Sequence, residues 1–266
     1  MSASESSPVD VLVPERLPGF SRPEPFVVRD GVAKLRDVYG GSPQAVQGWL
    51  SFDAYGASRA RMDPTWPRRI AGADIAVGAL VGDAPTDEQV DALLAPETRD
   101  RVDGALAAIP TDWALQDPLP PEAWDRLGAL YAALEVPGVD LRRMTRVLCV
   151  KRPRLVPCLS GPFRAPKGRT LAEAALDATR QVREVMARNR LALAEITAAT
   201  NAWLERVTPL SRRARLTPAR TLSELLAFEL GGYGRFSGWE ERGGEVRRKR
   251  EGAATRPVAG RRGRRS

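Results

Sequence analysis

The spacing of apolar residues is helical along most of the chain from about residue 73. An apolar run predicts a buried helix over 73–81, and apolar residues recur every three or four positions over 97–109 and again after Pro121. Threonines followed three residues later by Gln or Glu predict helix starts at Thr86 and Thr170. We find no strand–helix–strand alternation, so the pattern predicts an all-α, or mainly α, fold.

Further helix boundaries are predicted in the second half of the chain. Asp140 can cap a helix that runs to about residue 150. The helical stretch after Thr170 is long enough to break near Asn189, and Thr217 starts a last helix. Residues 30–55 have a weaker pattern, which fits a small helix or a pair of strands.

The two ends of the chain differ in composition from its middle. Residues 1–28 are rich in Pro and Ser, and we expect a disordered N-terminal segment. Residues 235–266 are rich in Arg and Gly and have few large apolar side chains, which predicts a disordered basic tail. Residues 29–234 are then expected to form a single α-helical domain.

Composition excludes several classes of protein. No apolar run approaches the twenty residues of a membrane span, and the N-terminus lacks the basic and apolar parts of a secretory signal. The chain has no histidine, which excludes histidine-dependent hydrolases, and its two cysteines form neither a disulfide framework nor a zinc site. We therefore expect a cytoplasmic protein without a metal or other cofactor.

Charge is distributed unevenly around a net value of +8. Residues 1–140 carry 12 Lys and Arg against 22 Asp and Glu, whereas residues 141–234 carry 18 against 7 and residues 235–266 carry 11 against 4. Such asymmetry indicates a polyanionic partner, although the two halves can also attract each other.

The basic half contains a window without any acidic residue, residues 141–172. Its positive charges favour phosphate if they share one face. A solvated surface, or pairing with the acidic half, explains them equally well. The nine basic residues of this window are Arg142, Arg143, Arg146, Lys151, Arg152, Arg154, Arg164, Lys167 and Arg169.

A tight turn, Val-Pro-Gly-Val at residues 136–139, separates two predicted helices. It resembles the helix–hairpin–helix motif, in which glycine permits close approach of a phosphate and the N–H groups of the second helix bind it. Gly138 matches the first glycine of that motif, and Arg142 and Arg143 occupy the first turn of the second helix. Asp140 replaces the second glycine and brings a negative charge to the phosphate position.

Residues 68–165 are also similar, more distantly, to helix–hairpin–helix DNA glycosylases. The catalytic aspartate of those enzymes lies some twenty residues after the second glycine, where this chain has Ser160. The lysine that attacks the sugar in the bifunctional enzymes is matched by Arg142, which cannot form a Schiff base. This resemblance therefore implies a related fold without base excision.

A closer similarity is to the actinobacterial domain-of-unknown-function family 6308. The segment Lys-Arg-Pro-Arg-Leu-Val-Pro at 151–157 and the final helix at 216–228 carry it, over roughly residues 30–232. Ser160 departs from the aspartate of this family's pattern as well. The resemblance implies a bacterial protein and supplies no activity.

Together these features predict a non-catalytic nucleic-acid-binding protein; they favour DNA over RNA as its partner and leave the choice between the two open. Gly138 and the nine basic residues of the window are its predicted contacts. One alternative is a protein–protein interaction or structural module whose opposite charges pair within the chain or in a dimer. Another is an enzyme that uses Asp140, Cys158 or Ser160. The sequence leaves the oligomeric state open.

Overall fold

A computed structural model describes residues 8–13, 25–40, 43–79, 84–159, 167–207 and 216–229. These residues form ten α-helices, one 3-10 helix and one antiparallel pair of strands, so the predicted mainly α fold is confirmed. In chain order the elements are β1 (Val11–Val13), β2 (Phe26–Val28), α1 (Gly31–Gly40), α2 (Pro43–Met62), η1 (Trp66–Arg68), α3 (Gly72–Ala79), α4 (Asp87–Leu94), α5 (Pro96–Ala107), α6 (Glu122–Ala133), α7 (Leu141–Lys151), α8 (Leu171–Arg188), α9 (Arg190–Val207) and α10 (Pro218–Glu229).

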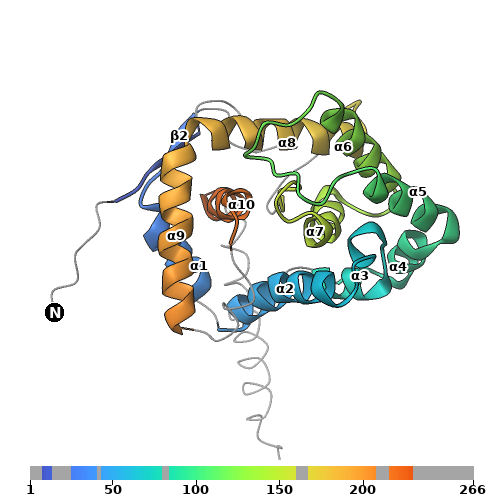
Figure 1. Cartoon of the computed structure of the whole chain (residues 1–266), viewed down its shortest axis with the longest axis horizontal. Coiled ribbons are helices and arrows are strands. Elements are labelled where there is room, and N and C mark those ends of the chain that lie inside the picture. Colours follow the sequence, from blue (N-terminus) through green and yellow to red (C-terminus); the bar gives the residue numbers. More distant parts are fainter. Residues whose placement is uncertain are drawn as a thin grey trace, which may run out of the picture.

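Two helices, α7 and α10, lie at the centre of the molecule. In Figure 1 they are surrounded by α9, α8, α6, α5, α4, α3 and α2. Every residue from Met144 to Lys151 in α7 is buried, and so is every residue from Ala219 to Leu226 in α10. A helix that is buried on all sides has no solvated face, so its polar side chains need partners inside the protein.

Part of the segment predicted to be disordered, residues 1–28, is ordered. β1 and β2 pair antiparallel, with Val11 opposite Val28 and Val13 opposite Phe26. Such a short strand pair is marginal by itself. Val11, Val13 and Val28 are fully buried, and their packing against the helices stabilises it. The predicted disordered tail, residues 235–266, lies outside the described residues.

Asn189 ends α8 at the predicted break and also holds β1. Its side-chain oxygen accepts a hydrogen bond from the N–H of Leu12 at 2.8 Å. Its side-chain nitrogen donates to the C=O of Leu12 at 2.6 Å and to that of Val185 at 2.8 Å. The amide pairs with both polar groups of Leu12 as a neighbouring strand would, which fixes β1 to the corner between α8 and α9.

The predicted helix starts are confirmed. The hydroxyls of Thr86 and Thr170 each accept a hydrogen bond from the third residue of the following helix, whose side chain accepts one from the threonine N–H. Asp140 likewise caps α7. Residues 30–55, which fit a helix or a strand pair, contain α1 and the first part of α2. Within the described residues, no helix combines the length and hydrophobicity that crossing a bilayer requires.

Arg152, directly after α7, connects three parts of the fold. The residue is 2% exposed, and its guanidinium donates to the carbonyls of Pro67 at 2.7 Å, Lys151 at 3.0 Å, Leu106 at 2.6 Å and Ile109 at 2.9 Å. Burial lowers the pKa of Arg152 to about 10, which leaves it charged at neutral pH. The end of α5, η1 and the end of α7 are thereby held together.

We expect Arg152→Lys to lower the free energy of unfolding by about 3 kcal/mol, because a single ammonium cannot reach four separate carbonyls. Urea denaturation measures this decrease. Arg154→Lys, at an exposed position two residues later, is the matched control and should change stability by less than about 0.5 kcal/mol. Equal effects of the two substitutions would contradict the role given to Arg152.

Candidate functional site

A tight turn joins α6 to α7 where the sequence predicts the hairpin. The N–H of Val139 donates to the C=O of Val136 at 3.2 Å. Gly138 is exposed and has a φ of +78°, a left-handed conformation that glycine adopts without strain. Its C=O accepts a hydrogen bond from Nε2 of Gln89 in α4 at 2.5 Å. This hydrogen bond therefore fixes the turn to α4.

Asp140 occupies the position at which the motif would place a phosphate. One carboxylate oxygen accepts a hydrogen bond from the N–H of Arg143 at 2.8 Å, which caps α7. The other lies 3.4 Å from Nη1 of Arg143 and 3.8 Å from Nη2 of Arg142. The negative charge of the carboxylate thus offsets part of the positive potential that would attract a phosphate to this helix end.

The ten predicted contacts are divided between surface and interior. Gly138, Arg154, Lys167 and Arg169 are exposed, Arg142 and Arg143 are half-buried, Arg146, Lys151 and Arg152 are buried, and Arg164 lies outside the described residues. The acid-free window therefore does not present all its charge on one exposed face, because its helix lies at the centre of the fold. Nucleic-acid contact by the remaining residues stays a prediction.

Lys151 forms a buried ion pair with Asp74 of α3. Its Nζ lies 2.8 Å from Oδ2 of Asp74, and both side chains are 0% exposed. The ammonium also donates to the C=O of Trp66 at 3.1 Å and lies 3.7 Å from the centre of the indole ring. Burial lowers the pKa of Lys151 to about 8, although the Asp74 carboxylate acts in the opposite direction.

Asp74 accepts hydrogen bonds from three further groups. Its carboxylate accepts from Nε1 of Trp66 at 2.9 Å, from the N–H of Ala71 at 2.8 Å and from the hydroxyl of Tyr55 at 3.3 Å. Burial raises the pKa of Tyr55, which keeps its phenol a donor. The network satisfies a buried charge pair and joins α2, η1, α3 and α7.

Two exposed basic residues of the window also have acidic partners. Nη2 of Arg154 lies 3.5 Å from Oδ2 of Asp117, and Arg169 pairs with Asp177. Exposed ion pairs of this kind contribute about 0–1 kcal/mol and are screened by salt. Arg154, like Lys151, is paired with a residue of the acidic first half of the chain.

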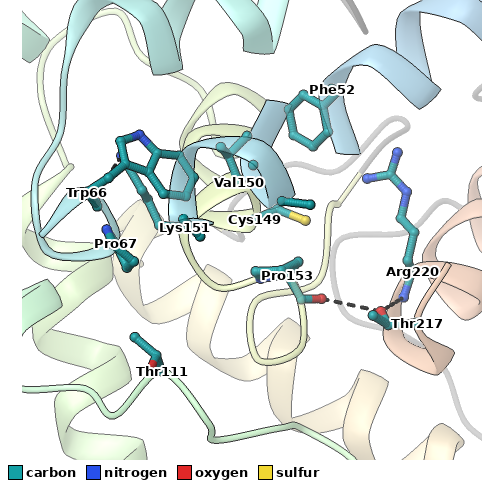
Figure 2. A pocket seen from close by; sticks show the side chains of 13 residues that line it. Phe52, Trp66, Pro67, Thr111, Cys149, Val150, Lys151, Pro153, Thr217 and Arg220 are labelled. Carbon is teal, nitrogen blue, oxygen red and sulfur yellow. Dashed lines mark hydrogen bonds between the residues drawn. The ribbon is translucent and has the colours of Figure 1, made fainter. Parts of the chain in front are cut away.

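A mainly apolar cleft of about 260 Å³ lies beside the C-terminal end of α7 (Figure 2). Phe52 of α2 and Trp66 of η1 form part of its wall, together with the last turn of α7. On the side of α10, Thr217 donates its hydroxyl to the C=O of Pro153 at 3.3 Å and accepts from the N–H of Arg220 at 3.2 Å. The described lining contains no carboxylate, and the Lys151 ammonium is held by Asp74.

Sequence reasoning did not find this cleft. Its lining comes from α2, η1, α7 and α10, which are far apart along the chain. The segments 151–157 and 216–228, singled out in the sequence, contribute Lys151, Pro153, Thr217 and Arg220 to it, but only the packing of these elements brings the lining residues together.

The enzyme alternative requires an acid close to Ser160. Ser160 lies outside the described residues, and Cys158 is fully buried. In the described ranges, no three His, Cys, Asp or Glu side chains gather in a way that could hold a metal ion.

Asp74→Asn should destabilise the protein by about 3 kcal/mol at pH 6, because it leaves a buried ammonium without its carboxylate. The destabilisation should shrink as the pH rises from 6 towards about 8 and stay constant above it, because without the Asp74 carboxylate, which raises the pKa of Lys151, this lysine loses its proton at a lower pH, and a neutral amine does not need the carboxylate. Urea denaturation between pH 6 and pH 9.5 measures both effects. Asp117→Asn, which breaks an exposed pair, is the control; a pH-independent destabilisation by Asp74→Asn would refute this account.

A model of the family of unknown function DUF6308 matches residues 32–210, more than half of the chain. The matched region contains the α6–α7 turn, the Lys151–Asp74 pair and all of α9, whereas α10 lies beyond it. No curated protein and no solved structure matches this chain. By the extent of the family match, the chain belongs to the family of unknown function DUF6308.

Proposed function

We propose that this protein binds nucleic acid without catalysing a reaction, through phosphate contacts beside the α6–α7 turn. The observation that carries the proposal is the position of α8. Glu135, just before the turn, accepts hydrogen bonds from the N–H groups of Leu171 at 2.9 Å and Ala172 at 3.4 Å. These bonds hold the start of α8 beside the turn, together with the exposed Lys167 and Arg169 that precede it.

Two basic stretches that are separate in the sequence therefore flank the turn. One is the first turn of α7, with Arg142 and Arg143, and the other is the stretch from Lys167 to Arg169. Clustered basic side chains bind the phosphate backbone by releasing its counterions, independently of base sequence. Because Asp140 and Asp177, the ion-pair partner of Arg169, offset part of this charge, we expect weak and strongly salt-dependent binding, with DNA as the first ligand to test.

The second candidate function is a protein-interaction or structural module with paired charges. The pairs Lys151–Asp74 and Arg154–Asp117 favour it, because each joins the basic half to the acidic half. This function predicts no preference for nucleic acid. If the charges also pair between chains, sedimentation at two ionic strengths should show an oligomer that dissociates in high salt.

The nucleic-acid proposal is tested by fluorescence anisotropy with labelled single- and double-stranded DNA and RNA between about 50 and 200 mM salt. We expect affinity to fall with salt, and Arg142→Ala combined with Arg143→Ala to reduce the slope of log K against log salt by about one for each phosphate that these arginines neutralise. Lys167→Ala with Arg169→Ala should act in the same direction. Deleting residues 235–266 separates any contribution of the basic tail.

The matched control is Arg99→Ala with Arg101→Ala, which removes two exposed arginines from α5 in the acidic half. It should leave the slope unchanged. The proposal fails if the wild-type chain shows no binding at low salt. It also fails if both double variants of the window leave binding unchanged, whatever the effect of the tail deletion.

A further inference from the structure

The cleft beside the C-terminal end of α7 has a buried floor and an exposed rim (Figure 2). The floor consists of side chains of residues that are at most 4% exposed: Phe52, Trp66, Cys149 and Val150. The rim consists of exposed residues from α2 and from the segments that follow α5 and α7: Ala57, Ala60, Thr111 and Pro153. A mainly apolar concave surface of this kind is typical of sites for small molecules.

The floor is held in place by the groups behind it. Nε1 of Trp66 donates to Asp74 at 2.9 Å, and the Lys151 ammonium lies 3.7 Å from the centre of the same indole ring. At Gly56, a Cβ would lie only 3.2 Å from the carbonyl oxygen of Val150, so α2 and α7 approach each other closely at this point. Closing the cleft would require these contacts to break. The cleft is therefore preformed, which lowers the cost of binding a ligand.

The charged side chains of the lining are already compensated. Lys151 and Arg220 belong to the lining, but both residues are only 4% exposed. Each lies beside a buried carboxylate, that of Asp74 at 2.8 Å and that of Glu224 at 2.6 Å. The described lining contains no carboxylate, and its more exposed polar side chains are hydroxyls: Thr111 and Thr217. A charged ligand would lose hydration in the cleft without gaining an opposite charge, so the lining favours a neutral one.

The volume of the cleft limits the size of such a ligand. It is about 260 Å³, whereas an apolar cavity of about 150 Å³ holds benzene and the sites of drug-sized ligands begin at about 300 Å³. The cleft therefore has room for about two fused rings.

We propose that this cleft binds a neutral, mainly apolar small molecule of up to about two fused rings, a size set by the cleft volume. The apolar floor and rim supply the contact area, and the hydroxyls of the lining can pair with an uncharged polar group of the ligand. The site goes beyond the proposed nucleic-acid binding and does not depend on it, because the phosphate contacts that we propose lie beside the other end of α7.

The probe for the test is 2-naphthol, a neutral two-ring compound, titrated into the full chain at neutral pH and followed by saturation-transfer NMR. We expect a Kd of about 1 mM or tighter. Two probes of the same ring size carry a charge, 2-naphthoate and 2-naphthylmethylammonium. Both should bind at least about tenfold more weakly than 2-naphthol, because the cleft offers them no opposite charge.

Two variants fill the cleft from its rim. Ala57→Phe and Ala60→Phe each add a ring at an exposed lining position of α2, so they occupy the space of the ligand without disturbing the core. Each should raise the Kd of 2-naphthol at least about tenfold, since two groups cannot share one packed volume. Ala129→Phe, at an exposed position of α6 outside the lining, is the matched control and should leave the Kd within about twofold. The three variants exchange the same side chains at exposed helical positions, so their unfolding midpoints should be similar.

Each outcome decides the proposal. Binding of 2-naphthol by wild type and Ala129→Phe, with weaker binding by the two rim variants, supports it. Equal binding by all four proteins would place the probe elsewhere and overturn it, as would no binding at about five times the expected Kd. Charged probes that bind as tightly as 2-naphthol would overturn the neutral class of ligand. The rim variants should bind DNA as wild type does, so a failure of the nucleic-acid proposal and a failure of this one are separate results.

Discussion

The burial of α7 on all sides is the constraint on which the rest of this structure depends. A cation in the protein interior is stable only where other groups solvate it or balance its charge. Asp74 does this for Lys151 and holds α3 and η1 against α7. Four carbonyls do it for Arg152 and fix the end of α5. The positions of the surrounding helices thus follow in part from the needs of the basic side chains that they enclose.

The same constraint gives the two ends of α7 different chemistry. At the C-terminal end the cations form ion pairs or hydrogen bonds with groups inside the protein, and the neighbouring cleft is mainly apolar. At the N-terminal end Arg142 and Arg143 remain half-buried, and Nε of the buried Arg146 has no hydrogen-bond partner. The phosphate contacts that we propose therefore lie at the N-terminal end, where the turn and the start of α8 also meet.

Asp140 has two opposing effects at that end. As the cap of α7 it stabilises the helix start and orders the turn that carries Gly138. As a carboxylate it weakens the attraction for a phosphate at the helix terminus.

The sequence by itself determined the helical fold, the capping boxes at Thr86 and Thr170, the cap at Asp140 and the break at Asn189, because these depend on residues within one turn of each other. It could not determine that β1 would be ordered, which depends on the distant Asn189 and on buried valines. Nor could it separate exposed from buried cations in the acid-free window. Only the tertiary structure decided that, because the carbonyl partners of Lys151 and Arg152, apart from the adjacent Lys151 C=O, come from residues 43 to 85 positions away, and burial is a property of the packed molecule.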